Sequence, residues 1–214
     1  MKNTMNKIAV AAAAMFISLS LCSAQNFVYT ITCGKNESKV TFIPKKDAPM
    51  SEMTVRMGTQ EARHLMDKNN CTTSWHVVDK PADTDITVTL RDGYYFLKGT
   101  FKGTAFDKKV KSDGTPWYQH IGYVAGHILK NGQKITFTCV RPTDMKLFLM
   151  TAEITGPEAI GKHKDAICVR VSPAGAFARL WKSYYYFNPK TLDFVGYHAV
   201  EGGPGTPESF WVLD

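Results

Sequence analysis

The chain has 214 residues, with 26 Lys and Arg against 19 Asp and Glu, which gives a formal charge of +7. This length can form one domain or two small ones with a sizeable hydrophobic core. The mildly basic charge favours anionic surfaces only weakly. Because the sequence has no nucleic-acid-binding motif, we expect no nucleic-acid partner.

Residues 1–24 have the organisation of a secretory signal peptide. Lys2 and Lys7 form the basic start, residues 8–21 the apolar middle, and Cys22-Ser23-Ala24 the small residues that a signal peptidase recognises. We expect cleavage after Ala24 and export to the periplasm, the cell surface or the medium. Acylation of Cys22 is a second possibility. A membrane anchor is disfavoured because the apolar middle is shorter than the about 20 residues that a span needs.

Residues 25–214 form the mature chain, which we expect to be a single all-β domain without a transmembrane segment. Its formal charge is +5, because the removed segment holds Lys2 and Lys7 and no acid. The first predicted strands, where apolar and polar residues alternate or branched residues gather, are Phe27–Cys33, Lys39–Ile43 and Glu52–Met57.

Thr59–Asn69 is the best helix candidate. Ala62, Leu65 and Met66 would share one face, Thr59 would cap the first turn, and Asn69-Asn70 would end the helix. A strand after a turn at Gly58-Thr59 is the alternative.

From Thr84 onward the sequence alternates strands and turns. Asp85–Arg91 leads through Asp92-Gly93, a two-residue hairpin signal, into Tyr94–Phe101. Asn131-Gly132 separates the predicted strands Ile121–Leu129 and Lys134–Val140 in the same way. Later strands are predicted at Met145–Ile154, Ala166–Val171 and Phe210–Leu213, with a loop at Gly202–Pro207. About ten strands and at most one short helix predict an antiparallel β-sandwich of jelly-roll type, with a closed antiparallel β-barrel as the alternative.

Trp181–His198 is predicted to be a hairpin that turns at Asn188-Pro189-Lys190-Thr191. If Phe187 pairs with Leu192, the two faces of the hairpin differ. The expected core face holds Trp181, Tyr185, Phe187, Leu192 and Phe194. The other face would meet water or a ligand through Lys182, Tyr184, Tyr186, Asp193 and Tyr197.

Four cysteines remain after export: Cys33, Cys71, Cys139 and Cys168. An even number in an exported protein favours at least one disulfide, with buried free thiols as the alternative. Their spacing supports neither a zinc ribbon nor a thioredoxin-like site.

The sequence contains no strong catalytic or cofactor-binding motif. The six histidines lack the spacing of a local metal site, so we predict no metal and no cofactor. Glu153, Asp193 and Glu201 could supply a pair of glycosidase carboxylates, although solvated surface acids are commoner. A nucleophilic Cys139 is disfavoured by its place on an apolar strand face.

Two further stretches combine aromatic and polar residues. Lys98–Lys111 interleaves five lysines with phenylalanines. This pattern could bind an anionic polymer, or it could be the ordinary alternation of half-buried strands. Asp113–His120 places Trp117 and Tyr118 beside a turn, where they are either ligand contacts or part of the core.

The function predicted from these observations is an exported binding module, most simply for carbohydrate or another small ligand, with the aromatic residues above as contacts. The alternatives are a structural or adhesion protein that binds another protein through its aromatic face, and a hydrolase with dispersed carboxylates.

Overall fold

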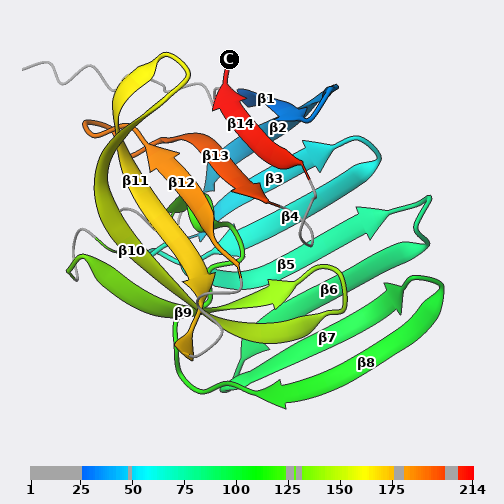
Figure 1. Ribbon diagram of the computed structural model, residues 1–214. Coiled ribbons are helices and arrows are strands. Elements are labelled where there is room, and N and C mark those ends of the chain that lie inside the picture. Colours follow the sequence, from blue (N-terminus) through cyan, green and yellow to red (C-terminus); the bar gives the residue numbers. More distant parts are fainter. Residues whose placement is uncertain (1–25, 48–49, 124–127, 129–131, 176–180, 201–206) are drawn as a thin grey trace, which may run out of the picture.

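The computed structural model describes residues 26–47, 50–123, 128, 132–175, 181–200 and 207–214. Within these residues, fourteen strands form one antiparallel sheet (Figure 1). The strands are β1 (Phe27–Cys33), β2 (Asn36–Asp47), β3 (Met50–Met57), β4 (Gln60–Met66), β5 (Thr72–Asp79), β6 (Thr84–Arg91), β7 (Tyr94–Phe101), β8 (Thr104–Lys111), β9 (Lys134–Arg141), β10 (Lys146–Ile160), β11 (His163–Pro173), β12 (Ser183–Phe187), β13 (Phe194–Val200) and β14 (Glu208–Leu213).

The strand order joins the two ends of the described chain in the middle of the sheet. It runs β8-β7-β6-β5-β4-β3-β2-β1-β14-β13-β12-β11-β10-β9, so β1 pairs with β14, and β8 and β9 are the two edges. Figure 1 shows the sheet curled, with β9–β13 in front of the wall formed by β1–β8. The predicted all-β, antiparallel fold is confirmed, and the sheet is not closed into a barrel.

Alternating residues fill the concave face of this curled sheet. The main core takes residues from both walls, among them Tyr29 and Phe42 from one side and Phe137, Val169 and Phe187 from the other. A second cluster joins Trp75, Val88 and Leu97 to Val140 and Leu147. The β9–β10 pair therefore packs across the concave side of β5–β7, which gives this part of the sheet the two layers of a sandwich.

The helix predicted over Thr59–Asn69 is wrong, because residues Gln60–Met66 form strand β4. Gly58, with φ of 57°, turns the chain after β3, and Met57 pairs with Gln60. Ala62, His64 and Met66 are buried at a period of two. The segment is a strand because β3 and β5 pair with its backbone on both edges and the core covers the face that holds Ala62 and Met66.

The strand predicted over Ile121–Leu129 is also wrong where the structure describes it. Residues Ile121–Tyr123 form a short 3-10 helix, η1, and Ile128 is fully buried in the main core. The rest of that prediction lies outside the described residues, as do the signal peptide and most of the Gly202–Pro207 loop. No helix in the described parts of the chain is long and apolar enough to span a bilayer.

Gly99 is the glycine with the strictest backbone requirement. Its φ is 139°, and a Cβ built there would lie 2.1 Å from the carbonyl oxygen of Asp85 on β6. The two strands approach so closely only because residue 99 has no side chain.

We therefore expect Gly99→Ala to lower the free energy of unfolding by about 3 kcal/mol or more, since a backbone clash is added to the φ strain. Gly93→Ala is the matched control: its φ is also positive, at 73°, but no atom lies within 4 Å of its built Cβ. It should cost only about 1 kcal/mol. Urea unfolding measures both, and equal losses would contradict the close approach.

Candidate functional site

The hairpin predicted over Trp181–His198 is present as β12 and β13. Asn188 organises its turn. The N–H of Asn188 donates to the carbonyl of Asp193, and the N–H of Leu192 donates to the carbonyl of Asn188, both at 2.9 Å. The side-chain Oδ1 of Asn188 also accepts the N–H of Lys190 at 2.9 Å. The Asx-type turn expected from the sequence is therefore made by this side chain.

The register of the hairpin differs from the prediction. Phe187 pairs with Phe194 rather than with Leu192, because Leu192 belongs to the turn with φ of 61°. The next pair along is Tyr186 with Gly196, so β13 contains one extra residue, Val195. This bulge moves Tyr197 onto the face of Tyr185, opposite to its predicted side.

The concave face of the hairpin carries a row of three aromatic residues. Tyr185, Tyr197 and Trp211 pair directly across β12, β13 and β14, and their ring centroids are 4.9 and 5.1 Å apart. Ile31 of β1 continues the row beside Trp211. Tyr185 and Trp211 are half-buried, whereas Tyr197 is 8% exposed. We call these four residues the inner aromatic row.

The convex face of the same three strands carries a second stack. His198 lies between Tyr184 and Phe210, with its ring centroid 5.9 Å from Tyr184 and 4.2 Å from Phe210. The rings are within 23° and 8° of parallel, so they mostly cover one another's faces. Phe210 is the most exposed of them, at 39%.

Tyr186 is buried beneath the long β10–β11 hairpin, which contradicts its predicted place on an open face. It belongs to a third apolar cluster on the convex side, together with Ile160, Ala166, Cys168 and Val195. A Cβ at Gly196 would lie 2.6 Å from the Ile160 side chain, so this glycine allows the end of β10 to lie close over β13. A hairpin of the protein itself therefore covers the surface expected to meet water or ligand.

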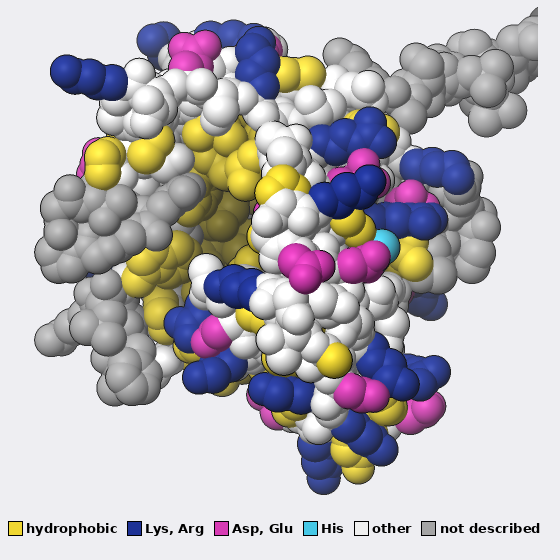
Figure 2. Space-filling model, turned by 90° about the vertical axis from the view of Figure 1, so that its right-hand side faces the viewer, with side chains coloured by type: hydrophobic (Ala, Val, Ile, Leu, Met, Phe, Trp, Pro, Cys, Tyr) yellow, Lys and Arg dark blue, Asp and Glu magenta, His cyan; other side chains and the backbone are white. Residues whose placement is uncertain are grey.

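Figure 2 shows a deep hollow lined by hydrophobic side chains on the side of the molecule that lies to the right in Figure 1. The hollow lies between the two walls of the curled sheet, so the concave face is accessible from this end.

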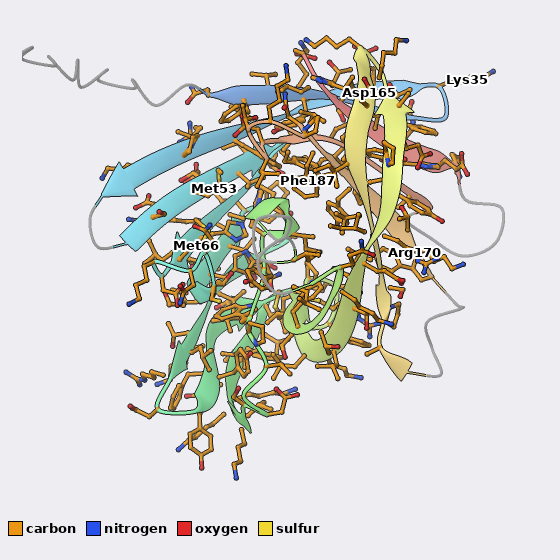
Figure 3. All side chains as sticks on the ribbon, turned by 90° about the vertical axis from the view of Figure 1, so that its left-hand side faces the viewer. Lys35, Met53, Met66, Asp165, Arg170 and Phe187 are labelled. Carbon is orange, nitrogen blue, oxygen red and sulfur yellow. The ribbon has the colours of Figure 1, made fainter. Side chains whose placement is uncertain are left out.

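The opposite end of the curled sheet is occupied by the segment that carries η1. Figure 3 shows this segment in the centre of the view, with Met53, Met66 and Phe187 around it. The His120 ring, just before η1, lies 4.7 Å from the Phe42 ring and 5.4 Å from the His64 ring. The concave face therefore resembles a cup with one occupied end and one open end.

The two histidines at the occupied end are held neutral by burial. Desolvation lowers the pKa of His64 well below 6.5, and the neighbouring His120 lowers it further. Desolvation also lowers the pKa of His120, to about 4. Neither imidazole carries a charge at neutral pH.

The remaining predicted contact residues are distributed over the molecule. Trp117 is buried in the cluster with Trp75, and its Nε1 donates to Gln119 Oε1 at 3.0 Å. Tyr118 is fully buried in the main core. Lys182 is exposed just before β12, and Asp193 is exposed in the hairpin turn. The seven predicted residues do not gather in one place, and only Tyr197 belongs to the inner aromatic row.

The sequence did not single out Ile31 or Trp211 as contacts. The only available signal was their alternation with polar neighbours, and the pairing of β1 with β14 that brings them to Tyr197 spans almost the whole chain.

The four cysteines are free thiols, contrary to the predicted disulfide. No two of them are opposite each other in the strand register: Cys33 pairs with Asn36 and Ser209, Cys139 with Phe148, and Cys168 with Tyr186. Burial raises the pKa of Cys139 to about 12 and that of Cys168 to about 11. These thiols are therefore protonated and unsuited to nucleophilic attack.

The three acids considered from the sequence as glycosidase carboxylates have different surroundings. Glu153 is bound to Arg170 at 2.8 Å on the convex face, Asp193 lies in the hairpin turn, and Glu201 is outside the described residues. Within the same part of the chain, no three His, Cys, Asp or Glu side chains are grouped as metal ligands.

Comparisons with known proteins give information on the fold only. No family model and no curated protein sequence matches the chain. The crystal structure of a β-barrel-like protein of domain of unknown function DUF1849 from Brucella abortus matches with a TM-score of 0.63 at 10% identity, covering 88% of this chain and 94% of that one. The hypothetical lipoprotein YmcC from Escherichia coli matches with a TM-score of 0.35 at 10% identity, covering 87% and 82%.

Acidification should destabilise the fold through the buried histidines. A histidine whose pKa is lower in the folded protein than in the unfolded chain stabilises the fold fully above pH 6.5. That contribution is lost as the pH falls toward the folded-state value. Between pH 6.5 and 4.5 we expect a loss approaching about 1.4 kcal/mol per pH unit for each histidine.

His64→Leu and His120→Leu should each reduce this pH dependence, as measured by urea unfolding across the range. Measurements stay above pH 4.5 because carboxyls whose pKa is lowered, such as Asp144 at about 2, lose their stabilising contribution mainly below the unfolded-state value of 3.8. An unchanged pH dependence in both variants would contradict this assignment.

The covered convex face predicts that two neighbouring tyrosines differ in their contribution to stability. Tyr186 is 3% exposed, and Tyr186→Ala should cost about 3–5 kcal/mol. Tyr184→Ala, on the same face but half-buried, should cost well below that. If chemical denaturation gave both variants the stability of the wild type, the β10–β11 hairpin would not cover Tyr186.

Proposed function

We propose that the protein is an exported binding protein that holds the apolar part of a small ligand in the hydrophobic hollow shown in Figure 2. That hollow is the observation on which the proposal rests. Soluble proteins normally fill their apolar concavities with side chains, and a wide hydrophobic opening is typical of a ligand site. Export rests on the signal-like residues 1–24.

The inner aromatic row is proposed to form part of the wall of this hollow. Its residues face the concave side, and Tyr185 and Trp211 keep part of their surface exposed although the main core begins next to them. The row contains no charged side chain. Tyr185 and Trp211 offer aromatic surface to a ligand, and the buried Tyr197 and Ile31 beside them keep this wall apolar.

An apolar ligand is favoured over a carbohydrate because the polar groups and ring faces of β12–β14 already have partners within the protein. A sugar needs donors and acceptors for its hydroxyls as well as an aromatic platform. The indole Nε1 of Trp211 already donates to Ser209 Oγ at 3.2 Å. On the convex face, Tyr184 stacks on His198, which leaves less ring surface for a pyranose. A ligand with a hydrocarbon body suits the concave surface better.

The adhesion and hydrolase alternatives have weaker support. Among the described residues, four large hydrophobic side chains are exposed. Val110 and Leu149 line one pocket between β8 and β10, whereas Met57 and Phe210 belong to β3 and β14, so the four are divided between different parts of the sheet. A hydrolase would need two carboxyls facing each other in a cleft, whereas Glu153 is neutralised by Arg170.

Binding of a fluorescent fatty acid such as cis-parinaric acid tests the proposal. The wild-type protein should bind the probe, and Tyr185→Asp should weaken binding roughly tenfold or more because it places a carboxylate on the apolar wall. Tyr184→Asp is the matched control, since residue 184 is adjacent, also half-buried and on the opposite face. It should leave affinity close to the wild-type value.

Thermal melts establish that both variants are folded under the assay conditions. Absence of probe binding to the wild type, or equal losses in the two variants, would overturn the proposal. Native mass spectrometry of the protein as purified gives an independent measurement, because a bound hydrophobic molecule would add a discrete mass.

A further inference from the structure

The β7–β8 hairpin carries exposed cations directly above aromatic rings. On the convex face, Arg91 pairs with Tyr94 and Tyr94 with Lys111, while Phe96 of the next row pairs with Lys109. The guanidinium of Arg91 lies 4.5 Å from the Phe96 ring centroid. The Lys109 ammonium lies 4.1 Å from the ring centroid of Tyr94. We call these five residues the basic aromatic surface.

The cations of the basic aromatic surface are not neutralised by neighbouring acids. Among the described residues, Arg91, Lys109 and Lys111 form no ion pair. Of the carboxylates near these cations in the strands and turns, Asp85 is bound to His76 at 2.8 Å and Asp107 lies 3.5 Å from Lys98. Asp113 accepts hydrogen bonds from Thr115, and Asp92, in the turn beside Arg91, forms no ion pair among the described residues. Three positive charges therefore remain available to an anion.

The concave side of the same hairpin repeats the pattern near its tip. The Lys108 ammonium lies 4.6 Å from the Phe106 ring centroid, and that of Lys102 lies 5.1 Å from Phe101. Strand β8 is the edge of the sheet, and all its residues except Phe106 are exposed. In Figure 2, dark blue and yellow side chains interleave at the lowest part of the molecule, which is where Figure 1 draws β7 and β8.

We propose that the β7–β8 hairpin docks the protein onto an anionic lipid surface. Lysine and arginine beside partly exposed aromatic rings suit the interface of a bilayer, where the cations meet phosphates and the rings reach the headgroup level. A linear acidic polymer would need its cations along one face or groove, whereas here they lie on both sides of an exposed edge. This inference does not depend on the proposed function, because it concerns a different surface.

Co-sedimentation with lipid vesicles tests the docking surface. The protein should bind vesicles in which about a third of the lipid is phosphatidylglycerol, should not bind pure phosphatidylcholine, and should dissociate as salt is raised. The triple variant Arg91→Gln/Lys109→Gln/Lys111→Gln should bind roughly 100-fold more weakly, at about fivefold for each cation removed.

A variant with the same net charge separates a local surface from a general effect of charge. Lys162→Gln/Lys164→Gln/Lys190→Gln removes three exposed lysines, two from the β10–β11 turn and the start of β11 and one from the β12–β13 turn, and should keep nearly all of the binding. Equal losses in the two triple variants would overturn the proposal. Because every substitution is on an exposed or half-exposed side chain, thermal melts should coincide with the wild type.

Soluble polygalacturonate distinguishes a membrane from an acidic glycan. It should compete weakly with vesicles and bind the protein little at physiological salt. Tight polygalacturonate binding that needs Arg91, Lys109 and Lys111, together with no vesicle binding, would assign the surface to a polymer and refute docking to lipid.

Discussion

The antiparallel pairing of β1 with β14 is the interaction on which the rest of the structure depends. It joins residues Tyr29–Cys33 to Ser209–Leu213 and so makes one sheet out of two runs of hairpins, β1–β8 and β9–β14. Without it, the two walls would be separate sheets with two additional free edges. The pairing also places Trp211 between Ile31 and Tyr197, so the continuous apolar row on the concave face exists only because the ends of the chain meet.

The two faces of strands β12–β14 have different surroundings. On the concave side, Tyr185, Tyr197 and Trp211 form the row that we propose as a wall of the hollow, while on the convex side the β10–β11 hairpin covers Tyr186 and Val195. Contacts on both faces at Tyr186 and Val195 bury this part of the β12–β13 pair, which carries Tyr185 and Tyr197 on its other side. A ligand site built on such a buried pair of strands loses little conformational entropy on binding.

The hollow and the basic aromatic surface are separate features of one curled sheet. The first is apolar and concave, and the second is cationic and lies at the free edge β8. The occupied end around η1, with His64 and His120 uncharged, closes the cup on the side away from the hollow.

The sequence by itself determined the antiparallel all-β class, most of the strands and the hairpin turns at Asp92-Gly93 and Asn188, because these follow from local periodicity and turn chemistry. Strand β5 was not predicted. Only the tertiary structure decided whether Gln60–Met66 is a strand, since burial between neighbours overrides local helix signals. The same holds for the site. A single bulge at Val195 exchanged the faces of Tyr197 and its neighbours, and the β10–β11 hairpin buried Tyr186. Register and long-range pairing are set by contacts between residues far apart in the chain, and a period of two cannot say which face another part of the protein will cover.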